Sequence, residues 1–334
     1  MRSLGGFAVH VPLRALICGA AVALVVLACA SAVVPPSEDF NPSNPYWNGL
    51  ERFCRAFNAS AISSPEALDP GSTVLFVVGP SFDASARAEA WKLFVEGGGI
   101  LVLMDEVGLV NGFLESLGLE VRVNGSPMLD AAFYYRSWRL PRASSLGLSD
   151  VKEGVESVVM DVPSVLELRG NAEGLRVLAW SSSFSFLDVN RDGEPSQGEP
   201  SGPFPLAVEA SYGRGRILLF SDSSIPVNGV VELGDNLKLL ESVASGRRVA
   251  VDVGVWSRPT SSIFRELVLS AWSAASSPDV KYSLAAVALA ASLYVGLKAG
   301  GPAVGAEPLE ELMRRHPDWD RRILEELWRE MERC

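Results

Sequence analysis

The stretch that decides the fold begins with Thr73-Val-Leu-Phe-Val-Val78, closed by Gly79-Pro80, and ends with Ile100-Leu-Val-Leu-Met104. Each apolar run is typical of a strand that is buried on both faces. Residues 81–96, between the runs, repeat apolar side chains at helical spacing and stop at three consecutive glycines. The stretch therefore predicts a strand, a crossover helix and a second, parallel strand that ends at Asp105-Glu106.

Similar signals on either side extend this unit into a larger α/β domain. Strands are predicted at residues 119–123, 155–162, 165–168, 175–180, 204–212, 216–220 and 248–255. Helices are predicted at residues 47–57, 109–117 and 236–244, with Asp235 as the N-cap of the last. Residues 124–150 give weak signals and resemble an irregular insertion. The fold class is α/β, a doubly wound, mainly parallel sheet with a β-rich insertion.

Composition narrows the classes of function. The chain has 334 residues, of which 48% are hydrophobic, a share that indicates membrane segments. The net charge of -11 argues against nucleic-acid binding, which needs a basic face. The four cysteines include two in the first apolar segment and one at the last residue, so they form no disulfide framework.

Two apolar segments are expected to span a membrane. The first is Leu16 to Val34, a nearly continuous apolar sequence that follows Arg2 and Arg14. The alternatives for this segment are a cleaved signal peptide and a lipoprotein signal that ends at Cys29. Residues 282–297 form an uncharged stretch between two lysines, with a buried core helix as the alternative.

Two spans would place both termini in the cytoplasm and the main domain outside the cell membrane. The expected organisation is an amino-terminal segment and span at 1–36 and an extracytoplasmic domain at 37–279. A second span at 280–300 and a cytoplasmic helical tail at 301–334 complete it.

The tail carries an amphipathic helix. Its apolar stripe consists of Trp319, Ile323, Leu327 and Met331. A lone helix cannot bury such a stripe, so we expect a protein partner, a second copy or the membrane surface to cover it. The alternative is that the stripe packs on the preceding helix of the tail.

The sharpest motif is Asp188-Val-Asn-Arg-Asp-Gly-Glu-Pro-Ser-Gln-Gly-Glu199, which fits the calcium-loop pattern D-x-[DN]-x-[DN]-G-x5-E. Calcium prefers six to eight oxygen ligands, and alternate positions of such a loop point inward. The flanking residues do not have helical patterns, so we expect a structural calcium loop between strands. The expected ligands are Asp188, Asn190, Asp192, Glu194, Ser196 and Glu199. The alternative is a solvated acidic turn.

Carboxylates follow the predicted strands where α/β folds place their ligands. Asp105 and Glu106 follow one strand and Asp222 follows another, although each also suits a turn or a helix cap. Histidine occurs only at His10 and His316, so residues 37–279 lack the base that Ser-His and Cys-His mechanisms need.

Several short motifs resemble a known family. They include Asn41-Pro-Ser-Asn44, Val77-Val-Gly-Pro80, Gly98-Gly-Ile-Leu-Val-Leu-Met-Asp105, Gly213-Arg-Gly-Arg-Ile-Leu-Leu-Phe-Ser-Asp222 and Asn228. The chain looks like archaeal and bacterial membrane-anchored proteins of unknown function with a class I glutamine amidotransferase-like, or flavodoxin-like, domain. Related domains occur in accessory subunits of gliding-type ABC transporters.

The resemblance implies a fold without amidotransferase chemistry, because no cysteine follows Met104, where the family's nucleophile would lie. The expected function is a non-catalytic binding or scaffold domain of a membrane complex. The alternatives are a substrate-handling subunit of an ABC-type transporter and a carboxylate-based hydrolase. Ligand-binding candidates are Gly79, Asp105, Glu106, Asp222 and Asn228.

Overall fold

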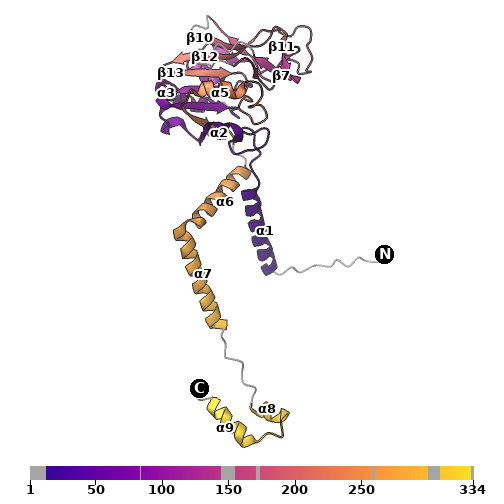
Figure 1. Cartoon of the computed structure of the whole chain (residues 1–334), viewed down its shortest axis with the longest axis vertical. Coiled ribbons are helices and arrows are strands. Elements are labelled where there is room, and N and C mark those ends of the chain that lie inside the picture. The colour runs from indigo at the N-terminus through magenta and orange to yellow at the C-terminus, as the bar shows by residue number, and fades with distance from the viewer. Residues whose placement is uncertain are drawn as a thin grey trace, which may run out of the picture. The chain divides into compact units, whose positions relative to one another are not determined.

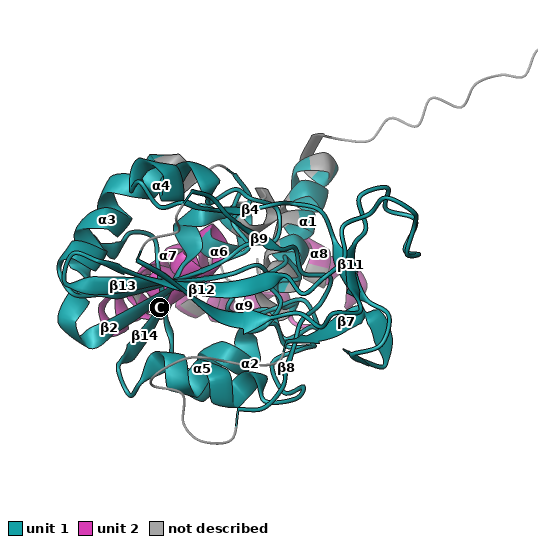
Figure 2. Cartoon of the chain, turned by 90° about the horizontal axis from the view of Figure 1, so that it is seen from above, with its two compact units in different colours: residues 1–266 teal, residues 267–334 magenta. Residues whose placement is uncertain are grey.

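The computed structural model describes residues 13–82, 84–143, 155–170, 174–257, 260–299 and 309–331 (Figure 1). The chain divides into two compact units, residues 1–266 and 267–334, which are described separately (Figure 2). The α-helices are α1 (Leu13–Val33), α2 (Glu51–Phe57), α3 (Ala88–Glu96), α4 (Asn111–Ser116), α5 (Asn236–Ala244), α6 (Thr260–Ser276), α7 (Pro278–Ala299), α8 (Leu309–Arg315) and α9 (Arg321–Met331). Short 3₁₀ helices are η1 (Pro65–Ala67), η2 (Pro70–Ser72), η3 (Ala84–Arg87) and η4 (Val253–Val255).

A seven-stranded, mainly parallel sheet forms the centre of the first unit. Its order is β1 (Ser60–Ile62), β14 (Arg248–Asp252), β2 (Thr73–Val78), β3 (Ile100–Met104), β13 (Gly215–Phe220), β12 (Pro205–Tyr212) and β10 (Leu175–Trp180). The first five strands in this order, β1, β14, β2, β3 and β13, are parallel to one another. The last two, β12 and β10, are added in antiparallel orientation at one edge. The predicted β2–α3–β3 crossover and the mainly parallel sheet are therefore confirmed.

Successive side chains of the central strands point to opposite faces of the sheet, so a separate hydrophobic core lies on each face. Phe76 and Val102 face one side with α2 and α5, whereas Leu75 and Leu101 face the other side with Trp91 of α3. Figure 2 shows α3 and α4 on one side of the sheet and α2 and α5 on the other. Strands covered on both faces must be apolar at successive positions, and this explains the uninterrupted runs in the sequence.

The β-rich insertion supplies three small antiparallel sheets beside the central sheet. They pair β4 (Val121–Val123) with β9 (Leu166–Leu168), β5 (Met128–Asp130) with β11 (Ser185–Leu187), and β7 (Ser137–Ala143) with both β6 (Tyr134–Tyr135) and β8 (Val158–Val159). The predicted irregular segment thus contains strands up to residue 143, and its residues 144–150 lie outside the described part.

The two segments predicted to span a membrane form helices, α1 and α7. A span requires about 20 consecutive, predominantly apolar residues. Taken over the described part of the chain, no helix combines the necessary length and apolar character, and α7, which begins at Pro278, carries Asp279 and Lys281 among its first four residues. This finding contradicts both predicted spans and, with them, the predicted membrane localisation, cytoplasmic termini and outer main domain. Arg2, used to orient the first span, lies outside the described residues.

The tail helices α8 and α9 are present in the second unit. Trp319, Ile323 and Leu327 of the predicted stripe are exposed, and the Trp319 ring stacks on His316 with 4.1 Å between ring centroids. The side chain of Met331 lies outside the described part. A partner for this stripe therefore stays a prediction.

Candidate functional site

The register of the sheet brings the ends of β2, β3 and β13 to one edge. Val78 pairs with Met104, and Met104 pairs with Phe220. The chain continues this alignment, because Gly79 N donates to Met104 O at 2.9 Å and Asp105 N donates to Phe220 O at 3.1 Å. Gly79, Asp105 and the residues after Phe220 therefore meet at the carboxyl edge of the sheet, where ligands bind in open α/β folds.

Asp105 organises the loop that leads to α4. Its Oδ1 accepts hydrogen bonds from Val107 N at 2.8 Å and Gly108 N at 3.0 Å, and its Oδ2 accepts one from Val110 N at 2.8 Å. The side chain is 1% exposed. Three backbone donors thus occupy both carboxylate oxygens, and the role is that of a turn-forming aspartate.

Gly79 lies beneath the ring of Phe40. The glycine has φ +50°, and a Cβ built on it would approach Phe40 Cε2 to 2.3 Å. The segment before α2 therefore covers the carboxyl end of β2.

Asn228 forms hydrogen bonds that hold the segment before α2 against the rest of the domain. Its Oδ1 accepts from Arg52 N at 2.8 Å, and its Nδ2 donates to Asn44 O at 2.8 Å and Tyr46 O at 2.6 Å. Its backbone N–H also donates to Gly49 O at 2.8 Å. The side chain is almost fully buried, so these bonds define a structural tie between distant parts of the chain.

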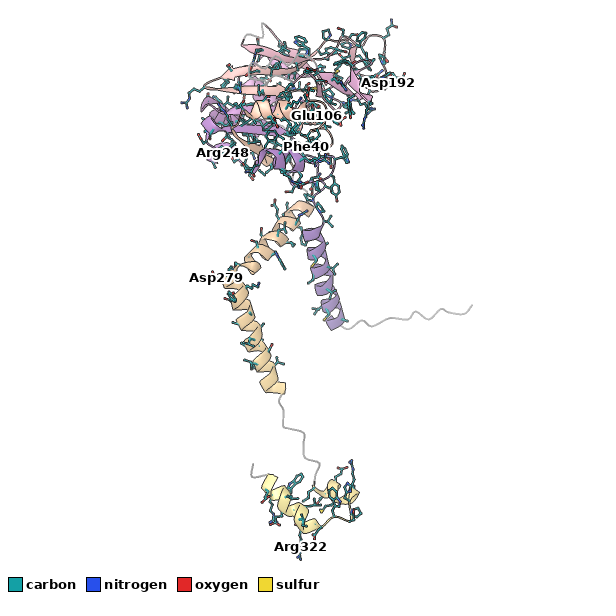
Figure 3. All side chains as sticks on the ribbon, viewed as in Figure 1. Phe40, Glu106, Asp192, Arg248, Asp279 and Arg322 are labelled. Carbon is teal, nitrogen blue, oxygen red and sulfur yellow. The ribbon has the colours of Figure 1, made fainter. Side chains whose placement is uncertain are left out.

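Glu106 and Asp222 are brought together beside Ser223. Ser223 donates to Glu106 Oε2 through its backbone N–H, at 3.0 Å, and through its hydroxyl. Figure 3 labels Glu106 among the side chains of the domain. Asp222, which has no exposed surface, accepts from Ser224 N at 2.7 Å and from Asp161 N at 2.9 Å. Asp161 was not among the predicted site residues, because it belongs to the insertion and reaches the edge only through the fold.

Burial changes the protonation of this group of carboxylates. Desolvation raises the pKa of Asp222 to about 8, with a further contribution from the charge of Glu106. Desolvation also raises the pKa of Glu106 and, against the opposing effect of Arg139, that of Asp161. At neutral pH, Asp222 is therefore mainly a neutral carboxyl group that can donate a proton.

A strained residue follows Asp161 in the chain, and its hydrogen-bond partner Arg139 lines a cavity. Val162 has φ +50°, an unfavourable conformation for a β-branched residue, and its N–H donates to Arg139 O at 2.7 Å. Arg139 also lines a cavity of about 480 Å³ together with Tyr134, Trp138 and the loop at Asp192. Backbone strain of this kind concentrates at functional sites, so the edge near Asp161 is the candidate site.

The loop at residues 188–199 has its carboxylates turned inward on its own backbone. Glu199 accepts from Val189 N and Ser196 N, both at 3.0 Å, and Asp188 Oδ2 accepts from Gly193 N at 3.1 Å. Asp188 Oδ1 is buried and has no hydrogen-bond partner. Over the described ranges, no three His, Cys, Asp or Glu side chains form a group that could hold a metal ion. This finding contradicts the predicted calcium-binding loop. The individual ligand assignments, to Asp188, Asn190, Asp192, Glu194, Ser196 and Glu199, are not tested and stay predictions.

A comparison with protein families identifies the domain that carries the site. Residues 43–244 match the family described as "Domain of unknown function (DUF4350)". The chain belongs to the DUF4350 family. The match includes most of the central sheet and the whole β-rich insertion, and thus Glu106, Asp161 and Asp222. A comparison with curated proteins gave no match.

Solved structures show only distant similarity to this DUF4350 protein. The mmIFT52 N-terminal domain has 14% identity and a TM-score of 0.37, with 52% of this chain and 77% of that chain covered. A cytoplasmic protein from Salmonella typhimurium LT2 has 15% identity and a TM-score of 0.34, over 56% and 76% of the two chains. A beta-galactosidase from Bacillus circulans sp. alkalophilus has 15% identity and a TM-score of 0.29, over 53% and 23%. These values are too low to carry an argument about function.

Proposed function

We propose that the DUF4350 domain is a binding or scaffold module that performs no catalysis of its own. The observation that supports this proposal is that three of the five predicted ligand-binding residues have structural roles. Asp105 bonds three backbone donors, Phe40 covers Gly79, and Asn228 ties down the segment before α2. The absence of histidine from residues 43–244 supports the same proposal, because it removes the commonest general base.

The resemblance to amidotransferase-like proteins extends this proposal. A domain of that kind without the nucleophilic cysteine would keep the sheet edge for recognition rather than for chemistry. The accessory subunits of gliding-type ABC transporters, which the chain also resembles, offer a substrate-handling role as the corresponding alternative. The module would then present a ligand or partner to another protein of its assembly.

Turnover measurements test the proposal directly. The full chain is assayed against a panel of ester, amide and glycoside substrates, with Asp222→Asn and the matched surface variant Asp235→Asn beside it. We expect no turnover above buffer for any of the three proteins. Robust turnover by the wild-type chain that Asp222→Asn abolishes and Asp235→Asn retains, at unchanged folding, would overturn the proposal.

A carboxylate-based hydrolase is the second candidate, and one observation favours it. Asp222 has a pKa of about 8 next to Glu106, and a pair of carboxyl groups with raised pKa values is a common arrangement for acid–base chemistry. The full burial of Asp222 and the structural role of Asp105 weigh against it. The same panel, repeated at several pH values, decides between the two, because a hydrolase would lose activity as pH rises through the pKa of its acid.

A partner for α9 is the remaining part of the proposal. Trp319, Ile323 and Leu327 leave an apolar stripe exposed on a helix whose other face is charged, with Arg321 bonded to Glu325 at 2.8 Å. Burial of that stripe against a protein partner would stabilise both helices. The chain has eight tryptophans, so the signature would be the part of a blue shift in total tryptophan fluorescence, on addition of a candidate partner, that Trp319→Ala removes.

A further inference from the structure

A second cavity lies at the opposite edge of the sheet, where the parallel strands begin. It has a volume of about 430 Å³ and lies beside Ile100 at the start of β3 and Gly215 at the start of β13. Its charged lining consists of Arg176, Arg214, Arg216, Arg247 and Glu209. Four guanidinium groups and one carboxylate leave a formal charge of +3 in a chain whose net charge is -11.

The antiparallel edge of the sheet places two of these arginines. Arg176 of β10 pairs in register with Glu209 of β12, and Arg216 of β13 pairs with Ser211 of β12. Glu209 accepts from both arginines, through Oε2 from Arg176 Nε at 3.1 Å and through Oε1 from Arg216 Nη1 at 3.2 Å. One carboxylate is thus shared by two guanidinium groups, which fixes both side chains on the cavity wall.

The tight turn between β12 and β13 fixes the third arginine. Arg214 is flanked by two glycines: a Cβ at Gly213 would lie 2.7 Å from Glu96 Cα, and one at Gly215 would lie 2.2 Å from Gly99 O. The turn can approach the end of α3 this closely only because both positions lack a side chain. Arg214 is held there by a hydrogen bond from its Nε to Glu96 O at 3.2 Å.

Arg247 approaches from the turn after α5. Its Nη1 donates to Gly98 O at 3.3 Å. Arg214 and Arg247 both bond backbone carbonyls, and within the described ranges neither has a carboxylate within ion-pair distance. Backbone carbonyls orient a guanidinium group but leave its charge uncompensated, so each retains donors for an anion.

We propose that this cavity binds a phosphorylated small molecule that carries at least two anionic groups. Arginine stays protonated at all physiological pH values, and its planar fork matches the oxygens of a phosphoryl group. The formal charge of +3 favours a multivalent ligand over a single carboxylate. A volume of about 430 Å³ lies in the range of small-molecule sites and exceeds the needs of one inorganic ion. The site is independent of the carboxylate cluster at the other edge.

Inorganic pyrophosphate is the probe for this site. The full chain is titrated by isothermal calorimetry in buffer without divalent cations, at a constant ionic strength of about 0.1 M, where distant charges are screened. We expect one saturable site per chain with a Kd below about 1 mM, and weaker binding of chloride and acetate at the same ionic strength. Pyrophosphate should also raise the melting temperature, because it binds the native state.

Paired variants separate this cavity from the general charge of the surface. R214Q/R247Q removes two positive charges from the cavity and keeps an amide donor at each position. R55Q/R169Q removes the same charge from exposed arginines that form ion pairs elsewhere, with Glu51 and Glu167. Each charge-assisted hydrogen bond lost corresponds to about tenfold in affinity or more, so R214Q/R247Q should bind pyrophosphate at least about tenfold more weakly.

The control pair should keep the wild-type affinity, and its melting temperature and circular dichroism serve as references for folding. An equal loss in both pairs, or no saturable binding by the wild-type chain, would overturn the proposal. If R214Q/R247Q does not fold, R214K/R247K takes its place, since lysine keeps the charge without the fork. Weakened binding by that pair supports the site, and wild-type affinity refutes it.

Discussion

Asp222 shows at the scale of one residue how the fold sets protonation. The unfolded chain would ionise this carboxyl near pH 3.8, whereas burial holds the folded pKa at about 8. Between these values the native state binds the additional proton, so the contribution of Asp222 to stability is full below about pH 3.8. It is lost progressively as pH rises through about 8.

Asp222→Asn should therefore flatten the dependence of stability on pH. Asparagine cannot accept from both Ser224 N and Asp161 N, so the variant should lose about 1–2 kcal/mol of unfolding free energy at pH 5. Between pH 5 and 8 the native wild-type chain keeps a proton that the unfolded chain has released, so wild-type stability falls by about 1.4 kcal/mol per pH unit. The deficit of the variant should therefore disappear and reverse before pH 8. Urea unfolding at pH 5, 6.5 and 8 measures this difference.

Asp235→Asn is the matched control for that series. Hydrogen bonds from Lys238 and from two backbone N–H groups lower the pKa of Asp235, so its contribution is lost only as pH falls below the usual aspartate range. Its deficit should stay constant from pH 5 to 8. A constant deficit for Asp222→Asn as well would show that Asp222 is ionised throughout.

Gly79 offers a second residue-scale prediction. Gly79→Ala places a methyl group against the Phe40 ring and forces alanine to adopt φ +50°, and we expect a loss of about 1–3 kcal/mol. Phe40→Ala in the same chain should return part of that loss by removing the clash. If the loss in the double variant equalled the sum of the two single losses, the backbone conformation alone would be responsible. Chemical denaturation of the wild type, the two single variants and the double variant gives the four unfolding free energies of this double-mutant cycle.

At the scale of elements, Asn228 joins the segment before α2 to the loop after β13. Asn228→Ala removes three hydrogen bonds and leaves buried partners unsatisfied, so the unfolding free energy should fall by about 2–4 kcal/mol. Hydrogen exchange should increase at the backbone N–H of Arg52, which loses its acceptor. Asn41→Ala, in the same segment but near its surface, should cost much less. Comparable losses would argue against the tie.

Local patterns predicted several elements closely and others poorly. β2, β3 and α5 agree with the expected bounds, because each has an uninterrupted apolar or amphipathic pattern and glycine or a polar turn nearby. The helix expected at residues 81–96 is a regular α-helix only from Ala88, after η3. Asp235 lies at the N-cap position but bonds Glu156 N and Ser157 N instead of its own helix, since a distant segment supplies better-placed donors.

The candidate site shows the same division between local and non-local information. Asp105, Glu106 and Asp222 were foreseeable because strand ends are visible in the sequence. Phe40 and Asp161 were not, because they come from segments that reach the edge only through long-range packing. The calcium motif fits a local pattern, yet its carboxylates bond their own loop, which a pattern of residue types cannot reveal.

At the scale of the whole molecule, both cores lie within a limited part of the chain. Their buried residues run from Leu50 to Val255, and Phe40 and Trp256 pack at the margins. Trp256 Nε1 donates to Val78 O at 2.8 Å, so the domain closes shortly after β14. A fragment of residues 37–257 should therefore fold alone and melt within a few degrees of the full chain.

The exposed hydrogen bond from Arg265 Nη1 to Val34 O, at 2.6 Å, joins two residues that both lie outside this fragment, so the truncation removes no partner from the domain there. A second fragment, residues 63–257, lacks β1, α2 and the segment with Phe40, and should fail to fold cooperatively because Leu50 and Phe53 leave the core. Calorimetry of both fragments separates the cases. Cooperative melting of the shorter fragment at the same temperature would show that the amino-terminal segment is an accessory to this fold.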